Sequence, residues 1–337
     1  MNAPVAHAPK ENASLVWTSP IKSELELVET RLRTAVESDV STALDISMHL
    51  FASGGKRIRP ALTILSALAS GTVRDKCSLI DIATAAELFH TASLIHDDVV
   101  DETSERRGRA TAASQWGNKI SVLGGDFLLA RTFFLLAGVG NVEVFDILSR
   151  TAARMTECEI LQACSEGDVD SWMANYWQII EGKTAAFLSG CCECGAVLSN
   201  ADRGIRDALS RYGFHVGIAF QITDDVLDIA GDPAQTGKDY AADLAQGKFT
   251  LPVILALSRA EQFKKESLQN QLRKGYLCAD EARKVAELVI ETGAIQAAQD
   301  EAQHHTRLAT QQLSLLPPSE YRSALESFAD LVTDRRH

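Results

Sequence analysis

The sequence has little proline and lacks it entirely over a long central stretch. Only eight of its 337 residues are proline, and none lies between Ala61 and Asp232. Proteins rich in turns seldom extend that far without proline, whereas helices exclude it because its ring removes a backbone donor and clashes with the preceding turn. The absence argues against a sheet protein with many turns and favours a largely helical chain.

Positive charge and long apolar runs are scarce as well. The 33 Lys and Arg face 45 Asp and Glu, for a formal net charge of −12, so nucleic acid is not an expected partner. No window approaches the roughly 18 uninterrupted apolar residues of a membrane span, and no signal-like segment follows Met1. We therefore expect neither a transmembrane segment nor export.

The cysteines lack the pattern of a disulfide framework. The seven are odd in number and irregularly spaced, so a reducing, cytoplasmic setting is expected. Cys191, Cys192 and Cys194 form a tight group, but no second Cys/His pair lies at a zinc-like distance from them. We interpret them as small core and surface residues, with a metal or redox role as the alternative.

The rest of the composition fits one folded domain. Residues 1–20 hold three of the eight prolines and show no apolar period, and we interpret them as a mobile N-terminal tail. From residue 21 to 337 the apolar residues recur at helical spacing, and no Pro/Gly/Ser linker divides the middle of the chain. With 46% hydrophobic residues, this part can form a substantial core.

An all-α fold is predicted, because no β-type alternation bounded by hairpin turns competes with the helical pattern. The predicted helices include segments at about 79–103, 109–117, 182–198 and 202–229. The first and last of these are apolar along much of their length and would lie inside the bundle.

Two acidic clusters each end one of these apolar helices. They consist of Asp97, Asp98 and Asp101, and of Asp224, Asp225 and Asp228. In a helix, the first and last carboxylates of each cluster lie one turn apart on the same face. Ligand sets of oxygen without His or Cys select hard cations, and Mg²⁺ prefers a few carboxylates plus substrate phosphates. The clusters predict such a site, with general acid–base catalysis and a solvated acidic helix end as alternatives.

Basic residues beside glycines surround these clusters. The candidates for holding phosphate are Lys56 and Arg59 in the turn at 54–60, Arg106 and Arg107 after the first cluster, Lys183 with Thr184, Lys238, and Lys248. Each alone is a weak signal, because exposed Lys and Arg are ordinary surface residues. His90 lies two helical turns before Asp97 on the same stripe, as a core histidine or a substrate contact.

These residues together resemble the trans-isoprenyl diphosphate synthases, the polyprenyl synthetase family. The matching segments are GGKRIRP at 54–60, HTASLIHDDVVDETSERRG at 90–108, GD at 125–126, GKT at 182–184, FQITDDVLD at 220–228, GK at 237–238 and DLAQGKFTLP at 243–252. The resemblance covers most of the chain. It implies a single all-α bundle of isoprenoid synthase type around a deep central apolar cavity, with the two aspartate motifs facing each other across its mouth.

The resemblance also implies a role for each matching residue. About three Mg²⁺ ions, with Mn²⁺ as a substitute, are expected at Asp97, Asp101, Asp224 and Asp228 to hold the diphosphate of an allylic substrate. The residues expected to assist them are Arg106, Lys183, Thr184, Gln221 and Lys238, and Lys248 remains a substrate-binding candidate because it lies beside a glycine. The residues expected to hold isopentenyl diphosphate are Lys56, Arg59, His90 and Arg107. Asp98 and Asp225 complete the expected catalytic motifs.

Two small residues are expected to set the product length. In the family, bulky aromatic residues just before the first motif stop chain growth early, whereas Ala92 and Ser93 are small here. The segment HTASLIHDDVVDE is most similar to long-chain members of octaprenyl type that make quinone side chains. We therefore expect a product of about 35 to 50 carbons, made from farnesyl or geranyl diphosphate and isopentenyl diphosphate.

Several alternatives to a long-chain synthase remain. They are a shorter-chain farnesyl or geranylgeranyl synthase, a non-catalytic subunit of a heteromeric synthase, and a terpene cyclase. The intact second cluster, Asp224 to Asp228, argues against the cyclase and the non-catalytic subunit. The resemblance further implies a homodimer. The cysteine usage indicates the cytoplasm, and association with membranes is expected only through the product.

Overall fold

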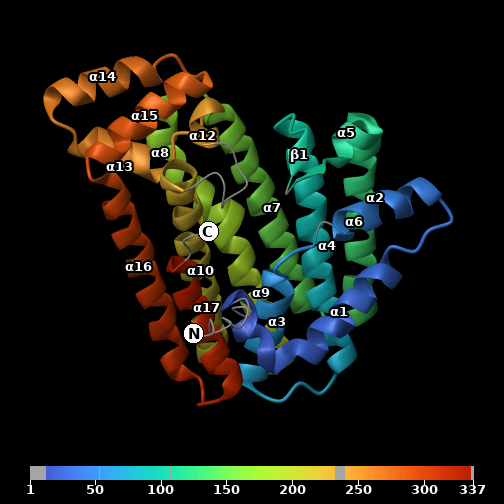
Figure 1. Cartoon of the computed structure of the whole chain (residues 1–337). Helices are drawn as coiled ribbons and strands as arrows, with labels where there is room; N and C mark the ends of the chain where they lie inside the picture. The colour runs from blue at the N-terminus through green and yellow to red at the C-terminus, as the bar shows by residue number, and fades with distance from the viewer. Residues whose placement is uncertain (1–12, 53, 107, 232–239, 335–337) are drawn as a thin grey trace, which may run out of the picture.

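A computed structural model of the chain describes residues 13–52, 54–106, 108–231 and 240–334, and these residues are almost entirely helical (Figure 1). The first part comprises η1 (Ala13–Ile21), α1 (Lys22–Ala35), α2 (Ser41–Ala52), α3 (Ile58–Ser70), α4 (Lys76–Val100), β1 (Glu105–Arg106) and β2 (Arg109–Ala110). The central part comprises α5 (Ala112–Trp116), α6 (Asn118–Val139), α7 (Val142–Ser165), α8 (Val169–Ile180), the π-helical turn η2 (Glu181–Ala185), α9 (Ala186–Leu198) and α10 (Arg203–Ala230). The last part comprises α12 (Ala242–Ala245), α13 (Leu251–Arg259), α14 (Gln262–Leu272), α15 (Ala279–Glu291), α16 (Ala294–Gln312), η3 (Leu313–Leu315) and α17 (Glu320–Thr333).

The two long helices α4 and α10 carry the aspartate motifs near their C-terminal ends. Each begins at an aspartate whose carboxylate accepts backbone hydrogen bonds: Asp75 from the amide of Ser78 at 3.2 Å, and Asp202 from that of Ile205 at 3.0 Å. The hairpin that follows α4 and the helix α12 that follows α10 lie at the same end of the bundle (Figure 1). The fold therefore brings both motifs to one end.

The main departure from the predicted helices lies just after the first motif. α4 ends at Val100, and an antiparallel pair of two-residue strands precedes α5, where we had predicted helix from about residue 109. The backbone takes left-handed conformations at Glu102 (φ +50°) and Gly108 (φ +72°), which end the helix and turn the hairpin. Strands this short leave no alternation that a sequence could reveal.

The last part of the predicted N-terminal tail has helical structure. Residues 13–20 lie within the 3₁₀ helix η1, and the earlier residues of the predicted tail, 1–12, lie outside the described part of the chain. Trp17 is only 4% exposed, and its ring lies 4.4 Å from that of Phe328 in α17. Burial of this aromatic pair fixes the segment against the last helix.

The cysteine group lies in the core. Cys191, Cys192 and Cys194 are all buried in α9, which confirms the core interpretation and leaves none of the three at the surface. Burial raises the pKa of Cys191 to about 12, so this thiol stays protonated and is a poor nucleophile or metal ligand.

Among the described helices, α4 and α6 are long and apolar enough to cross a membrane by length and composition. In α4, 67% of the apolar window is buried inside the protein, as in a core helix. In α6 only 33% is buried, and Phe133 and Phe134 are 55% and 71% exposed. α6 therefore presents an apolar outer face.

Candidate active site

The first motif presents a pair of carboxylates on one face of α4. The amide of Asp101 donates to the carbonyl of Asp97 at 2.8 Å, which places the two residues one helical turn apart. Burial raises the pKa of Asp97 to about 6; Lys183 opposes this rise, and Glu159 adds to it. The raised pKa reflects the loss of water around the carboxylate and the negative charge nearby. A bound cation would stabilise its ionised form.

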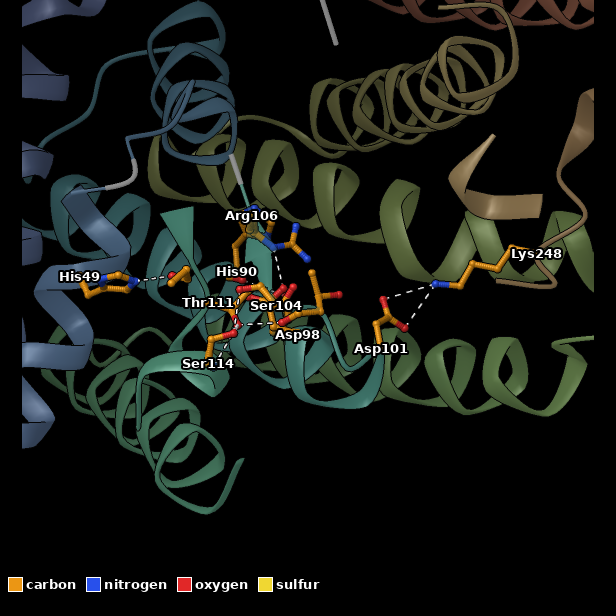
Figure 2. Close-up of polar contacts among 12 residues, drawn as sticks. His49, His90, Asp98, Asp101, Ser104, Arg106, Thr111, Ser114 and Lys248 are labelled. Carbon is orange, nitrogen blue, oxygen red and sulfur yellow. Dashed lines mark hydrogen bonds and ion pairs between the residues drawn. The ribbon is translucent and has the colours of Figure 1, made fainter. Parts of the chain in front are cut away.

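Asp98 points elsewhere and holds Arg106. Its side chain is almost fully buried and accepts a hydrogen bond from Nε of Arg106 at 2.8 Å (Figure 2). Burial raises the pKa of Asp98, while Arg106 acts to lower it. The Asp98 carboxylate therefore anchors Arg106, a candidate phosphate-binding residue, and does not form a pair with the carboxylate of Asp97.

A set of hydrogen bonds fixes the hairpin that carries Arg106. The Thr111 hydroxyl donates to the carbonyl of Thr103, and the Ser114 hydroxyl to that of Ser104, each at 2.7 Å (Figure 2). His49 of α2 donates from Nε2 to a hairpin carbonyl at 2.8 Å. Arg107, also expected in the site, lies outside the described residues.

Lys248 joins a distant part of the chain to the first motif. Its Nζ lies 3.3 Å from both carboxylate oxygens of Asp101 (Figure 2). It also lies 3.9 Å from Oε1 of Glu166, which follows the end of α7. The contact spans 147 residues of sequence. The expected assignment of Lys248 to this site is thus supported by its position.

Lys183 is presented by the π-helical turn η2. Its Nζ lies 2.6 Å from Oε2 of Glu159 and 3.3 Å from Oε1 of Gln162, both in α7. Burial acts to lower the pKa of Lys183, but Glu159 and Asp97 outweigh it and the pKa is raised. Lys183 is therefore a fixed cation that faces the first motif.

α7 contributes residues to the site that were not predicted from the sequence. Glu159 and Gln162 are spaced at i and i+3, so they share one face of that helix, and Glu166 directly follows its last residue. All three contact Lys183 or Lys248. The sequence signal that could have identified these residues was a row of polar side chains on a half-buried helix.

The second motif contains a buried hydrogen-bond chain. Asp225 is 1% exposed and accepts from the Tyr176 hydroxyl at 2.6 Å and from Nε2 of Gln221 at 3.0 Å. The Thr184 hydroxyl donates to Oε1 of Gln221 at 3.0 Å. Burial raises the pKa of Asp225 to about 7, with Asp243 adding to the rise and the two hydrogen bonds opposing it. Asp225 thus faces the interior, and Tyr176 is a further residue that sequence reasoning missed.

The outer residues of the second motif lie at the end of α10. Asp224 is half-buried, while Asp228 is 7% exposed and accepts from the amide of Asp243 at 3.3 Å. Asp228, an expected metal ligand, is thereby engaged with the start of α12. Lys238 lies outside the described residues.

Lys183, Thr184, Gln221, Asp225 and Lys248 line one cavity of about 140 Å³. Its walls come from α7, α8, η2, α10 and the segment around Lys248. Four of the lining residues are ones for which sequence reasoning predicted a diphosphate contact. Their shared cavity is the geometric basis for treating them as one site.

Two of the residues expected to hold isopentenyl diphosphate lie on α3 and α4, near Phe187 of α9. The Arg59 guanidinium lies 5.1 Å from the centre of the Phe187 ring, and the His90 ring lies 6.4 Å from it. Lys56 is exposed at the turn before α3. Arg57 pairs with Glu87 at 2.8 Å and so fixes this turn to α4.

The two residues expected to set product length lie one turn before the motif. Ala92 is fully buried in α4. The Ser93 hydroxyl donates to the carbonyl of His90 at 2.9 Å. Neither side chain is bulky at this position along α4.

The donor set fits Mg²⁺. Within the described residues, no three His, Cys, Asp or Glu side chains converge as a closed metal cage. Mg²⁺ does not require one, because it keeps several waters and binds through one or two carboxylates plus substrate phosphates. Asp97 and Asp101 supply such a pair of hard oxygen ligands.

The chain belongs to the polyprenyl synthetase family, because residues 41–289 match the family model described as "Polyprenyl synthetase". It is 35% identical over 317 residues to the all-trans-nonaprenyl-diphosphate synthase (geranyl-diphosphate specific) of Rhodobacter capsulatus, covering 94% of this chain and 96% of that protein. It is 33% identical over 314 residues to the octaprenyl diphosphate synthase of Haemophilus influenzae, covering 93% and 94%.

The solved structures agree. A polyprenyl synthase from Caulobacter crescentus, complexed with calcium and isoprenyl diphosphate, superposes with a TM-score of 0.90 at 34% identity, covering 95% of this chain and 97% of that one. The predicted all-α isoprenoid synthase fold and family are confirmed. The protein is a prenyltransferase.

Proposed function

We propose that the protein is a Mg²⁺-dependent long-chain polyprenyl diphosphate synthase. It extends farnesyl or geranyl diphosphate with isopentenyl diphosphate to an all-trans product of about 35 to 50 carbons for quinone side chains. The observation that carries the proposal is the convergence at the first motif: Lys183 acts on the pKa of Asp97, and Lys248 lies 3.3 Å from Asp101. The lysines Lys183 and Lys248, from later segments of the chain, thus lie at the carboxylate pair. A bound metal–diphosphate complex requires both kinds of group.

The reaction begins by ionisation of the allylic substrate. The bond between C1 and the diphosphate oxygen breaks, and its electron pair leaves with the diphosphate. Arg106, Lys183 and Lys248 are placed to stabilise this negative charge as it develops. Mg²⁺ at Asp97 and Asp101 supplies further positive charge when bound. The double bond of isopentenyl diphosphate attacks the allylic cation, and loss of a proton gives a chain five carbons longer, so no protein nucleophile is needed.

The second substrate is assigned to residues in and around α3 and α4. We place isopentenyl diphosphate near Arg59 and His90, with Lys56 and Arg107 as further cations. The contact of Arg59 with the face of Phe187 supports this assignment, because it holds the guanidinium in a fixed direction. Ala92 and Ser93 support a long product, because neither side chain is bulky enough to stop a growing chain.

The proposed assembly is a homodimer that uses α6. Phe134 is 71% exposed and Leu123, on the same stripe, is 54% exposed, so α6 presents a continuous apolar face. A second copy of this face would cover it with two-fold symmetry. The seven cysteines are all free thiols, which supports a cytoplasmic setting.

Removal of a single aspartate tests the proposed site. Asp97→Ala and Asp224→Ala should each lower incorporation of isopentenyl diphosphate into farnesyl diphosphate by at least about a hundredfold, because each removes a ligand for transition-state charge. The measurement is turnover with Mg²⁺, beside the helical circular dichroism spectrum, which should not change. Asp146→Ala, on the exposed part of α7, is the control and should keep full activity. Retained turnover in both site variants would contradict the assignment.

A further inference from the structure

Tyr176 stands behind the substrate-binding residues of the second motif. Its side chain is 1% exposed in α8, and its hydroxyl donates to Oδ2 of Asp225 at 2.6 Å across 49 residues of sequence. The hydroxyl lies too deep to reach bulk solvent. Its contact with Asp225 is therefore an internal one, on the wall of the 140 Å³ cavity.

A chain of hydrogen bonds continues from Asp225 through Gln221 to Thr184 at the cavity surface, and each side chain in it donates to the one before. Because Oδ2 of Asp225 is held by Tyr176, Oδ1 is fixed toward Nε2 of Gln221 at 3.0 Å. An amide has its donor at one end and its acceptor at the other, so Oε1 of Gln221 must face the Thr184 hydroxyl, which donates to it at 3.0 Å. Each side chain thus sets the rotamer of the next.

We propose that Tyr176 is a positioning residue for the diphosphate of the allylic substrate. It acts through Asp225 and Gln221 on Thr184, and it does not touch the substrate itself. The inference rests on the proposed function, in which Gln221 and Thr184 bind that diphosphate. Without the Tyr176 hydroxyl, Oδ2 of the buried Asp225 loses its donor, and the carboxylate is free to rotate toward another one. Gln221 and Thr184 then lose their fixed orientation.

The chain supplies a matched control in Tyr212. This residue is also fully buried, and its hydroxyl donates one hydrogen bond, to the backbone carbonyl of Leu325 in α17 at 2.7 Å. Tyr→Phe removes the same single hydroxyl at both positions. Tyr212 contacts none of the cavity residues through this bond, so it reports what a lost buried hydrogen bond does to the fold alone.

The experiment compares Tyr176→Phe and Tyr212→Phe with the wild type in the full chain. Both variants should have a lower melting temperature. Only Tyr176→Phe should raise the KM for farnesyl diphosphate, by about five- to tenfold, the loss that corresponds to one misaligned hydrogen bond. Its KM for isopentenyl diphosphate should stay within about twofold of the wild-type value, because the hydrogen-bond chain from Tyr176 to Thr184 includes none of the residues assigned to that substrate.

A double variant tests the route of the effect. In a Gln221→Leu background, Tyr176→Phe should raise the KM for farnesyl diphosphate no further, since the link to Thr184 is already broken. An unchanged KM in Tyr176→Phe, an equal rise in Tyr212→Phe, or full additivity with Gln221→Leu would each overturn the inference. If the wild type does not turn over, the proposed function fails, and binding of inorganic diphosphate with Mg²⁺ to the same variants still decides the role of Tyr176.

Discussion

Charge at the first aspartate motif is unbalanced before any substrate binds. Four carboxylates lie near only two ammonium groups there. The carboxylates are those of Asp97, Asp101, Glu159 and Glu166, and the ammonium groups are those of Lys183 and Lys248. The excess is negative, and the site is partly desolvated. This is the arrangement that a divalent cation neutralises, and the metal-free protein bears the repulsion within its fold.

The stability of the metal-free protein should therefore depend on Asp97 and on pH. The pKa of Asp97 is raised from 3.8 to about 6 in the fold, so this group stabilises the native state fully below pH 3.8 and loses that contribution as pH rises through 6. Asp97→Asn should raise the free energy of unfolding by about 1–3 kcal/mol at pH 8 and by less at pH 4.5.

Urea denaturation at both pH values with EDTA measures this effect. Asp146→Asn, an exposed carboxylate on α7, is the matched control and should change stability little at either pH. An equal effect of Asp97→Asn at pH 8 and pH 4.5 would contradict the proposed repulsion. The variant should at the same time be inactive, because the site sacrifices stability for metal binding.

The aspartates of the site could be predicted from the sequence, but the residues that form hydrogen bonds with them could not. The spacing of Asp97 and Asp101 places them on one helix face, because the periodicity of α4 is visible in its apolar residues. The inward direction of Asp225 depends on Tyr176, 49 residues away in a different helix. Such a contact is set by how α8 packs against α10, which no local pattern encodes.

The π-helical turn η2 is the element on which the position of Lys183 depends. It follows α8 directly and lies against α7, where a Cβ atom at Gly182 would be 2.1 Å from Sγ of Cys158. Only glycine allows this approach. A π turn inserted in a helix often marks a functional site, and here it brings Lys183 to Glu159.

Gly182→Ala should separate η2 from α7. We expect a loss of about 1–3 kcal/mol in the free energy of unfolding from overpacking, together with a fall in turnover as Lys183 moves away from Glu159. Denaturation and turnover measure the two effects. Adding Cys158→Ala removes the nearest atom and should restore part of both; a Gly182→Ala protein with wild-type activity would contradict this role for η2.

At the level of elements, the long helices were predictable and the short irregular ones were not. The apolar period of α4 and α10 extends over many turns, so their existence follows from the sequence. The hairpin at Glu105–Ala110 has two residues in each strand, and η2 has five residues inside a continuous helical pattern. The hairpin and η2 both depend on contacts with neighbouring helices, and the apolar periodicity of the sequence does not indicate such contacts.

Among the described residues, α6 presents an apolar outer face that the proposed dimer would cover. Phe134→Lys in α6 should convert a dimer of 36.5 kDa chains into a monomer, because it places a charge in the proposed contact. Light scattering after size exclusion measures the mass. Phe263→Lys in α14, where Phe263 is 85% exposed, is the control and should stay dimeric. A wild-type monomer, or dissociation of both variants, would contradict the use of α6.

At the same scale, the central claim is that one end of this helical bundle ionises an allylic diphosphate and builds a long chain from it. The most direct measurement is the size of the product made from farnesyl and isopentenyl diphosphates with Mg²⁺, after removal of the diphosphate. The account predicts a main product of about 35 to 50 carbons, consistent with the small residues Ala92 and Ser93. A main product of 15 or 20 carbons would contradict it.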